Sequence, residues 1–284
     1  MKKLFLLLLI SNYSFSQSFV PNAPDLDLKS YILIEPTTNT IIAESNSTGL
    51  IEPASMTKVM TAYVLADQID NDLISLDDKV LISERAWKMG GSKMFIEVGK
   101  KVSIEDLLKG IIIQSGNDAA VAISEYVGGT EDGFVDLMNA YAVSLGMDNT
   151  DFRNSTGLPD EKHLTSSKDL ATLTSNFITK FPDIFALFKE KEFEYGGISG
   201  NKFNRNKLLW RDETADGVKT GYTSSAGYCL IGSAIRGNMR LITVVAGSDT
   251  ANKSFADTQR LLEYGFRFYA CLLYTSDAAD EITG

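Results

Sequence analysis

The feature that most constrains this fold is the placement of its strand-forming patterns, which lie near the two ends of the chain. Residues 31–35 and 40–44 flank the turn-forming segment 36–39, which predicts a β-hairpin. A second pair of strand-forming runs, 227–235 and 239–246, is joined by the turn-forming residues 236–238. We therefore expect one sheet assembled from both ends of the chain.

Helix-forming patterns occupy the sequence between the two hairpins. Ser166 to Asp169 resembles a capping box that opens one of these helices. We expect helices over residues 55–67, 104–114, 119–127, 133–145, 170–179 and, after the second hairpin, 251–268. The sequence thus predicts an α+β fold with an antiparallel sheet built from both chain ends and a helical insertion.

Composition excludes several functional classes. The chain has 284 residues with 27 basic against 37 acidic side chains, and its net charge of −10 argues against a nucleic-acid binder. Cys229 and Cys271 are the only cysteines and His163 is the only histidine. This set supports neither a disulfide framework nor a Cys/His zinc site. We expect His163 to be a structural loop residue.

The first residues have the pattern of a signal peptide rather than of a folded segment. Lys2 and Lys3 precede an apolar run over residues 4–10, and small residues flank Phe15 before Gln17. The alternative is a buried N-terminal helix. We predict a signal peptide over 1–16, a linker over 17–27 and a catalytic domain over 28–268. The protein is then exported to the periplasm or the cell envelope outside the cytoplasmic membrane.

The last residues fit no clear pattern. Residues 271–284 continue neither a helical period nor a strand alternation, so we expect 269–284 to be a tail of doubtful origin. After the leader, no stretch approaches the roughly 18 apolar residues of a membrane span.

A first chemical motif is Ser55-Met56-Thr57-Lys58 at the start of the first expected helix. A spacing of three residues puts Ser55 and Lys58 on one helical face. A serine hydroxyl needs a neighbouring base to become a nucleophile, and lysine serves as that base only if its pKa is lowered. The alternative is a helix cap followed by a surface lysine.

Two further motifs follow in the chain. Ser115-Gly116-Asn117 lies between two expected helices, where a serine and an amide could face one cleft. Lys219-Thr220-Gly221 leads into the second hairpin and is followed by Tyr222 and Thr223. Its glycine would let another backbone approach an edge strand closely, and its lysine and threonine suit an anionic group. Taken singly, these motifs could be a capped loop and a turn before a strand.

The three motifs together, in this order, are typical of penicillin-binding proteins and class A β-lactamases. The chain resembles a serine-type D-alanyl-D-alanine carboxypeptidase, a low-molecular-mass penicillin-binding protein. The likeness includes residues 52–61, 114–119, 204–210, 216–221 and 264–268. It implies a β-lactamase/transpeptidase-like fold and no metal or organic cofactor. The implied partners are a peptidoglycan stem peptide ending in D-Ala-D-Ala and β-lactam antibiotics as covalent inhibitors.

The resemblance also implies roles for the motif residues. Ser55 would attack the carbonyl between the two D-alanines with Lys58 as base, and the N–H groups of Ser55 and Tyr222 would bind the oxyanion. Ser115 and Lys219 would pass a proton to the departing D-alanine. The remaining assignments are Asn117 for orienting the acyl amide and Lys219, Thr220, Gly221, Tyr222 and Thr223 for binding the substrate.

Departures from the family keep alternatives open. Many such carboxypeptidases continue into a β-rich domain and an anchoring helix that this sequence does not include, so we leave membrane association open. Ser248 and Asp249 stand where some members have an arginine. A peptidoglycan endopeptidase is the closest alternative, and a β-lactam sensor is another. A class A β-lactamase would need a Glu-x-x-Leu-Asn loop and an aspartate in place of Gly116. An esterase with S-x-x-K chemistry is less favoured. A Ser-His-Asp hydrolase would need a G-x-S-x-G motif, which is absent from the sequence.

Overall fold

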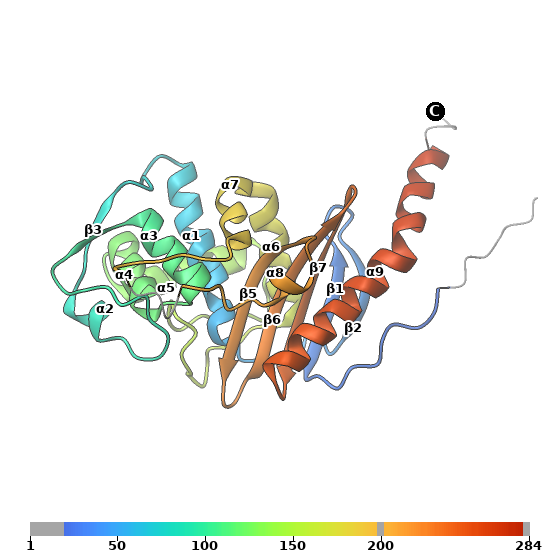
Figure 1. The fold of residues 1–284 in the computed structure, drawn as a ribbon, viewed down its shortest axis with the longest axis horizontal. Helices are drawn as coiled ribbons and strands as arrows, with labels where there is room; N and C mark the ends of the chain where they lie inside the picture. Colours follow the sequence, from blue (N-terminus) through green and yellow to red (C-terminus); the bar gives the residue numbers. More distant parts are fainter. Residues whose placement is uncertain (1–19, 198–201, 281–284) are drawn as a thin grey trace, which may run out of the picture.

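The computed structural model describes residues 20–197 and 202–280, so the predicted signal peptide over 1–16 lies outside the described residues. Strands near the beginning and toward the end of the described chain enclose a mostly helical middle, and a long helix follows the last strand (Figure 1). In chain order the elements are β1 (Ser30–Glu35), β2 (Thr40–Ser45), η1 (Ala54–Thr57), α1 (Lys58–Asp70), β3 (Lys79–Leu81), α2 (Glu84–Lys88), β4 (Lys101–Ser103), α3 (Ile104–Lys109), η2 (Gly110–Gln114), α4 (Asn117–Gly128), α5 (Glu131–Ser144), α6 (Ser167–Lys180), α7 (Pro182–Phe185), η3 (Ala186–Lys189), α8 (Leu208–Arg211), β5 (Ala215–Thr223), β6 (Gly227–Arg236), β7 (Met239–Ser248) and α9 (Ala251–Asp280).

The main sheet joins the two ends of the chain, as predicted. Its five antiparallel strands have the order β2-β1-β7-β6-β5. The join is made by β1 and β7, where Ile32 lies opposite Val244. β5 is an edge strand, so one of its sides is not covered by another strand.

Both faces of the sheet are buried, because side chains alternate between faces along each strand. Ile32 and Ile34 of β1 belong to the larger core, which lies between the sheet and the helical middle. Leu33 of the same strand packs with residues of α9 in a second core on the opposite face. Figure 1 shows α9 crossing the sheet on the side away from the other long helices. The sheet is therefore a central layer with helices on both sides.

Three of the expected helices differ from the sequence prediction in helix type or by more than three residues in extent. The helix expected over 55–67 opens with the 3₁₀ turn η1, and the one expected over 104–114 ends in the π-helical segment η2. The closing helix does not end at 268, because α9 continues to Asp280. No glycine or proline follows Gly265 within that stretch to stop it. The expectation that residues 271–284 lack helical character is thus wrong as far as Asp280.

Strand β5 is longer than predicted. The Lys219-Thr220-Gly221 motif was expected to begin a strand, but β5 already starts at Ala215. Asp216 and Gly217 favour strands poorly, which is why the pattern missed this part. The motif therefore lies inside an edge strand that is paired along its length with β6.

The N-terminal segment is in contact with the domain. Residues 20–27, within the predicted linker, have no regular secondary structure, yet Leu26 is buried in the core beside α9. Tyr264 of α9 donates a hydrogen bond of 2.8 Å to the Pro21 carbonyl. Within the described ranges, no helix has the length and apolar character needed to cross a membrane.

Candidate active site

Ser55 lies on a strained turn that enters α1. It belongs to the 3₁₀ turn η1, and the preceding Ala54 has a left-handed backbone with φ of 46°. β5 passes close beside this turn, since a Cβ on Gly221 would lie 3.0 Å from the Pro53 carbonyl oxygen. Glycine at position 221 therefore permits the close approach that its motif predicted. Ser55 lines a cavity of about 530 Å³ at this junction.

Lys58 contacts Ser55 and is almost fully buried. Its Nζ lies 3.1 Å from the Oγ of Ser55. The same nitrogen donates to the Oδ1 of Asn117 at 2.7 Å and to the Thr156 carbonyl at 2.6 Å. These last two partners can only accept, so they take two N–H groups. A neutral amine then has its lone pair left for the hydroxyl proton of Ser55.

The surroundings of Lys58 favour that neutral form. Burial lowers the pKa of Lys58 well below its usual value, and the charges of Lys219 and Arg205 lower it further. The carboxylate of Asp118 acts in the opposite direction but does not reverse the effect. Lys58 therefore has the two properties of a general base, contact with the nucleophile and a lowered pKa.

Ser115 and Lys219 form a second buried pair in the site. Ser115 follows η2 and has a left-handed backbone with φ of 60°. Lys219 of β5 donates to the Ser115 Oγ at 3.0 Å and to the Thr220 carbonyl at 3.1 Å. Burial and the charge of Arg205 lower the pKa of Lys219 to about 7. Near neutral pH this lysine can therefore exchange a proton through Ser115.

Asn117 is the first residue of α4 and is held at both ends of its amide. Its Oδ1 accepts from Lys58, and its Nδ2 donates to the Gly90 carbonyl at 2.7 Å. An amide nitrogen has two N–H groups, so one is left for a ligand. The structure thus brings together all five residues of the predicted catalytic set: Ser55, Lys58, Ser115, Asn117 and Lys219.

The predicted binding residues separate into two groups. Thr220, Gly221 and Tyr222 line the cavity, whereas Lys219 and Thr223 do not. The hydroxyl of Thr223 donates to a Glu52 carboxylate oxygen at 3.4 Å and accepts from the Ala226 N–H at 3.0 Å. Thr223 thus faces a negative charge and helps to close the turn after β5, and its assignment as a substrate-binding residue stays a prediction.

Two groups at the site were missed from the sequence. Arg205 lines the cavity and lowers the pKa of Lys219. Its place in the family-like stretch 204–210 was the one available hint. No sequence signal indicated the Thr156 carbonyl, because every residue has a carbonyl and only the folded structure shows which one contacts Lys58.

His163 lies outside the cavity that contains Ser55. Its ring is buried, with Nε2 at 3.0 Å from the Thr57 hydroxyl and Nδ1 accepting from the Arg153 N–H at 3.4 Å. Burial lowers the pKa of His163 to about 4. These contacts agree with its predicted structural role.

Known proteins share this arrangement of the chain. Residues 17–250 match the model of the peptidase S11 family, described as D-alanyl-D-alanine carboxypeptidase. The chain is 40% identical to D-alanyl-D-alanine carboxypeptidase DacC of Escherichia coli over 93% of its own length and 67% of that protein. Curated relatives of this kind are covered over 63–67% of their length.

Solved structures agree with this sequence match. Penicillin-binding protein 5 of Haemophilus influenzae is 37% identical with a TM-score of 0.84, over 87% of this chain and 73% of that one. Penicillin-binding protein D2 of Listeria monocytogenes, solved in a cefotaxime-bound form, is 30% identical with a TM-score of 0.78, over 87% of this chain and 99% of that one. The predicted fold class is therefore confirmed.

Proposed function

Because the chain belongs to the D-alanyl-D-alanine carboxypeptidase family S11, we propose that it removes the terminal D-alanine from peptidoglycan stem peptides through an acyl-enzyme on Ser55. The observation that supports this most is the set of partners of Lys58. Two carbonyl oxygens take two of its N–H groups, and the Ser55 hydroxyl lies at the position of the lone pair.

Acylation follows from this geometry. The Ser55 Oγ attacks the carbonyl carbon between the two D-alanines while its proton passes to Lys58. The negative charge that develops on the carbonyl oxygen is stabilised by the N–H groups of Ser55 and Tyr222, which both line the cavity. As the C–N bond breaks, Ser115 donates its proton to the leaving amine and is reprotonated by Lys219, 3.0 Å away. Water then hydrolyses the acyl-enzyme and restores Ser55.

Recognition of the chain end requires a group that binds one carboxylate. The protein has a net charge of −10, so this recognition must be local. Thr220 and Arg205 provide it, since both line the cavity that contains Ser55, and the charge of Arg205 also acts on the buried Lys219. We assign no part of it to Thr223, because its hydroxyl is bonded to Glu52 and to the Ala226 N–H. A hydrogen bond to a charged group is worth roughly 1.5–3 kcal/mol, so Thr220→Val should lower kcat/KM about 10- to 100-fold.

The test measures D-alanine release from an acyl-D-Ala-D-Ala peptide with a free or an amidated C-terminus. The wild-type protein should prefer the free acid, and Thr220→Val should lose most of that preference, while Thr223→Val keeps it. Equal cleavage of the amidated peptide by wild type would identify an endopeptidase. In parallel, a fluorescent penicillin should label wild type and leave Ser55→Ala unlabelled.

The same labelling distinguishes the other candidates. A lasting penicillin adduct together with D-alanine release is the carboxypeptidase result. Rapid drug hydrolysis would indicate a β-lactamase, and an adduct without peptide turnover would indicate a sensor. β-Lactams are thus proposed as covalent inhibitors. We further propose export to the cell envelope, which a mass spectrum of the mature N-terminus after residue 16 would test.

A further inference from the structure

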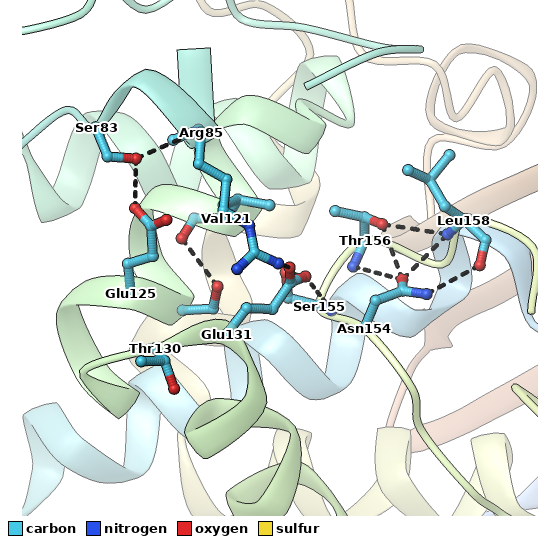
Figure 2. Close-up of polar contacts among 12 residues, drawn as sticks. Ser83, Arg85, Val121, Glu125, Thr130, Glu131, Asn154, Ser155, Thr156 and Leu158 are labelled. Carbon is cyan, nitrogen blue, oxygen red and sulfur yellow. Dashed lines mark hydrogen bonds and ion pairs between the residues drawn. The ribbon is translucent and has the colours of Figure 1, made fainter. Parts of the chain in front are cut away.

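Residues 154–158 form a tight loop around the side chain of Asn154. The Oδ1 of Asn154 accepts from the N–H groups of Thr156, Gly157 and Leu158 and from the Thr156 hydroxyl, at 2.7–3.2 Å. Its Nδ2 donates to the Leu158 carbonyl at 3.0 Å. Figure 2 shows this oxygen at the meeting point of the dashed lines from Thr156 and Leu158. One side chain therefore fixes the direction of several consecutive peptide groups.

Glu131, the first residue of α5, anchors the same loop from the other side. One of its carboxylate oxygens accepts from the N–H and the hydroxyl of Ser155, at 3.0 and 2.8 Å. The other oxygen is paired with Arg85 of α2 (Figure 2). Glu131 is 5% exposed, whereas the Arg85 side chain is 55% exposed. Burying a carboxylate costs free energy unless hydrogen bonds and a counter-charge compensate for it. Here Ser155 and Arg85 provide that compensation, so Glu131 links the loop to α5 and α2.

The loop contacts the catalytic turn at successive residues. The Ser155 carbonyl accepts from Thr61 of α1 at 2.7 Å, and the Thr156 carbonyl accepts from Lys58 at 2.6 Å. Gly157 packs directly on the turn before the nucleophile, where a Cβ would lie 1.8 Å from the Ala54 carbonyl oxygen. The loop thus lies against both the base and the residue next to Ser55.

We propose that Asn154 and Glu131 are positioning residues for the general base, acting through the Thr156 carbonyl, which they hold against Lys58. This rests on the proposed acylation of Ser55. If the carbonyl turns away, the amine loses one of its two acceptors, rotates, and no longer aims its lone pair at the Ser55 hydroxyl. Small misplacements of a reacting group cost up to about 100-fold in rate.

The effect is geometric rather than one of charge. The charged groups that act on Lys58 are Lys219 of β5, Arg205 before α8 and Asp118 of α4. The charge of Glu131 is offset by Arg85, and Asn154 has none. A positioning role therefore predicts a slower chemical step with unchanged non-covalent binding.

The experiment measures the acylation rate constant at saturating penicillin, and separately the drug's dissociation constant before acylation. Rates are compared on the plateau of each variant's pH profile. Asn154→Ala should slow acylation about 10- to 100-fold without changing the dissociation constant. Asn154→Asp keeps the accepting oxygen and should recover most of the rate. Glu131→Gln keeps an oxygen for Ser155 but turns an N–H group toward Arg85, and should slow acylation about 3- to 10-fold.

Asp67→Asn is the matched control, because Asp67 is another buried carboxylate and lies in α1 itself, toward the opposite end of the helix from Lys58. It should lower the melting temperature and leave the acylation rate unchanged. Wild-type rates in both Asn154→Ala and Glu131→Gln would overturn the proposal, and so would an equal slowing in Asp67→Asn. Penicillin acylation reports on Ser55 and Lys58 whichever peptide bond is cleaved, so a wild type that releases no D-alanine would contradict the proposed function alone.

Discussion

The two ends of helix α1 each hold a buried ionisable side chain, and the two side chains have different kinds of hydrogen-bond partner. At the C-terminal end, Asp67 accepts hydrogen bonds from Lys180 at 2.6 Å and from Asn71 and Tyr141. At the N-terminal end, the hydrogen-bond partners of Lys58 within residues 20–197 and 202–280 are uncharged oxygen atoms. One buried group therefore forms an ion pair, whereas the other is hydrogen-bonded to neutral oxygen atoms in the part of the chain that the structure describes.

This difference decides the protonation state at each end. Burial raises the pKa of Asp67, but the hydrogen bonds from Lys180 and Tyr141 outweigh it and hold the pKa below its usual value. Burial lowers the pKa of Lys58, and the nearby cations Lys219 and Arg205 add to the effect. Asp67 thus stays charged and links α1 to its neighbours, while Lys58 is kept as a reactive amine. A buried ionisable side chain without a counter-ion, such as Lys58, is the stronger indication of chemistry.

The largest expected effect concerns Lys58, at the N-terminal end of α1. Lys58→Arg keeps a cation but cannot lose its proton, so acylation by penicillin should fall about 10³-fold or more. The same substitution at the other end, Lys180→Arg, preserves the ion pair with Asp67 and should leave acylation unchanged. Stopped-flow labelling of both variants measures the comparison directly. Near wild-type acylation by Lys58→Arg would mean that another group is the base.

The second effect is on acid stability and concerns His163, which contacts Thr57 beside Lys58. Its pKa falls from 6.5 to about 4 on folding, so between these values the unfolded state binds more protons than the folded state. The stability contributed by neutral His163 is complete above pH 6.5 and is lost as the pH falls to about 4. The loss amounts to about 3 kcal/mol.

His163→Gln removes this titration while keeping a polar side chain. Urea unfolding at pH 7 and at pH 4.5 should show a smaller pH dependence for the variant than for wild type. Carboxylates elsewhere contribute equally to both proteins and cancel in the difference. The interpretation fails if the two proteins lose stability in parallel.

Local patterns in the sequence were enough to predict the sheet. The alternation over 31–35 buries both faces of β1, and the turn at 236–238 joins β6 to β7 as expected. The alternation of side chains along a strand also applies to the two threonines of the third motif. Thr220 and Thr223 are an odd number of residues apart in one strand, so their side chains leave opposite faces of β5.

The parts of the site that sequence could not predict depend on tertiary contacts. Asn154 and Glu131 are polar residues in ordinary loop and helix-start positions, and nothing local connects them with Lys58. Their connection passes through backbone groups of Ser155 and Thr156, whose directions are set only by the folded loop. Motifs identify the side chains that react, whereas the groups that orient them require coordinates.

The smallest expected effect concerns Asp67, at the C-terminal end of α1. Tyr141 of α5 donates to Asp67, and burial together with this hydrogen bond raises the pKa of Tyr141 to about 12. Tyr141→Phe removes this donor but leaves Lys180 and Asn71 on the carboxylate. The lost hydrogen bond should therefore reduce the free energy of unfolding by about 1.5 kcal/mol, the low end for a bond to a charged group, because the carboxylate keeps its other donors. Acylation should be unchanged, because Asp67 remains charged and Lys58 keeps its own partners. Urea unfolding and penicillin labelling of the same preparation check both expectations. A slowed acylation at this end would show that the two ends of α1 are coupled through the helix, which their separate sets of hydrogen bonds argue against.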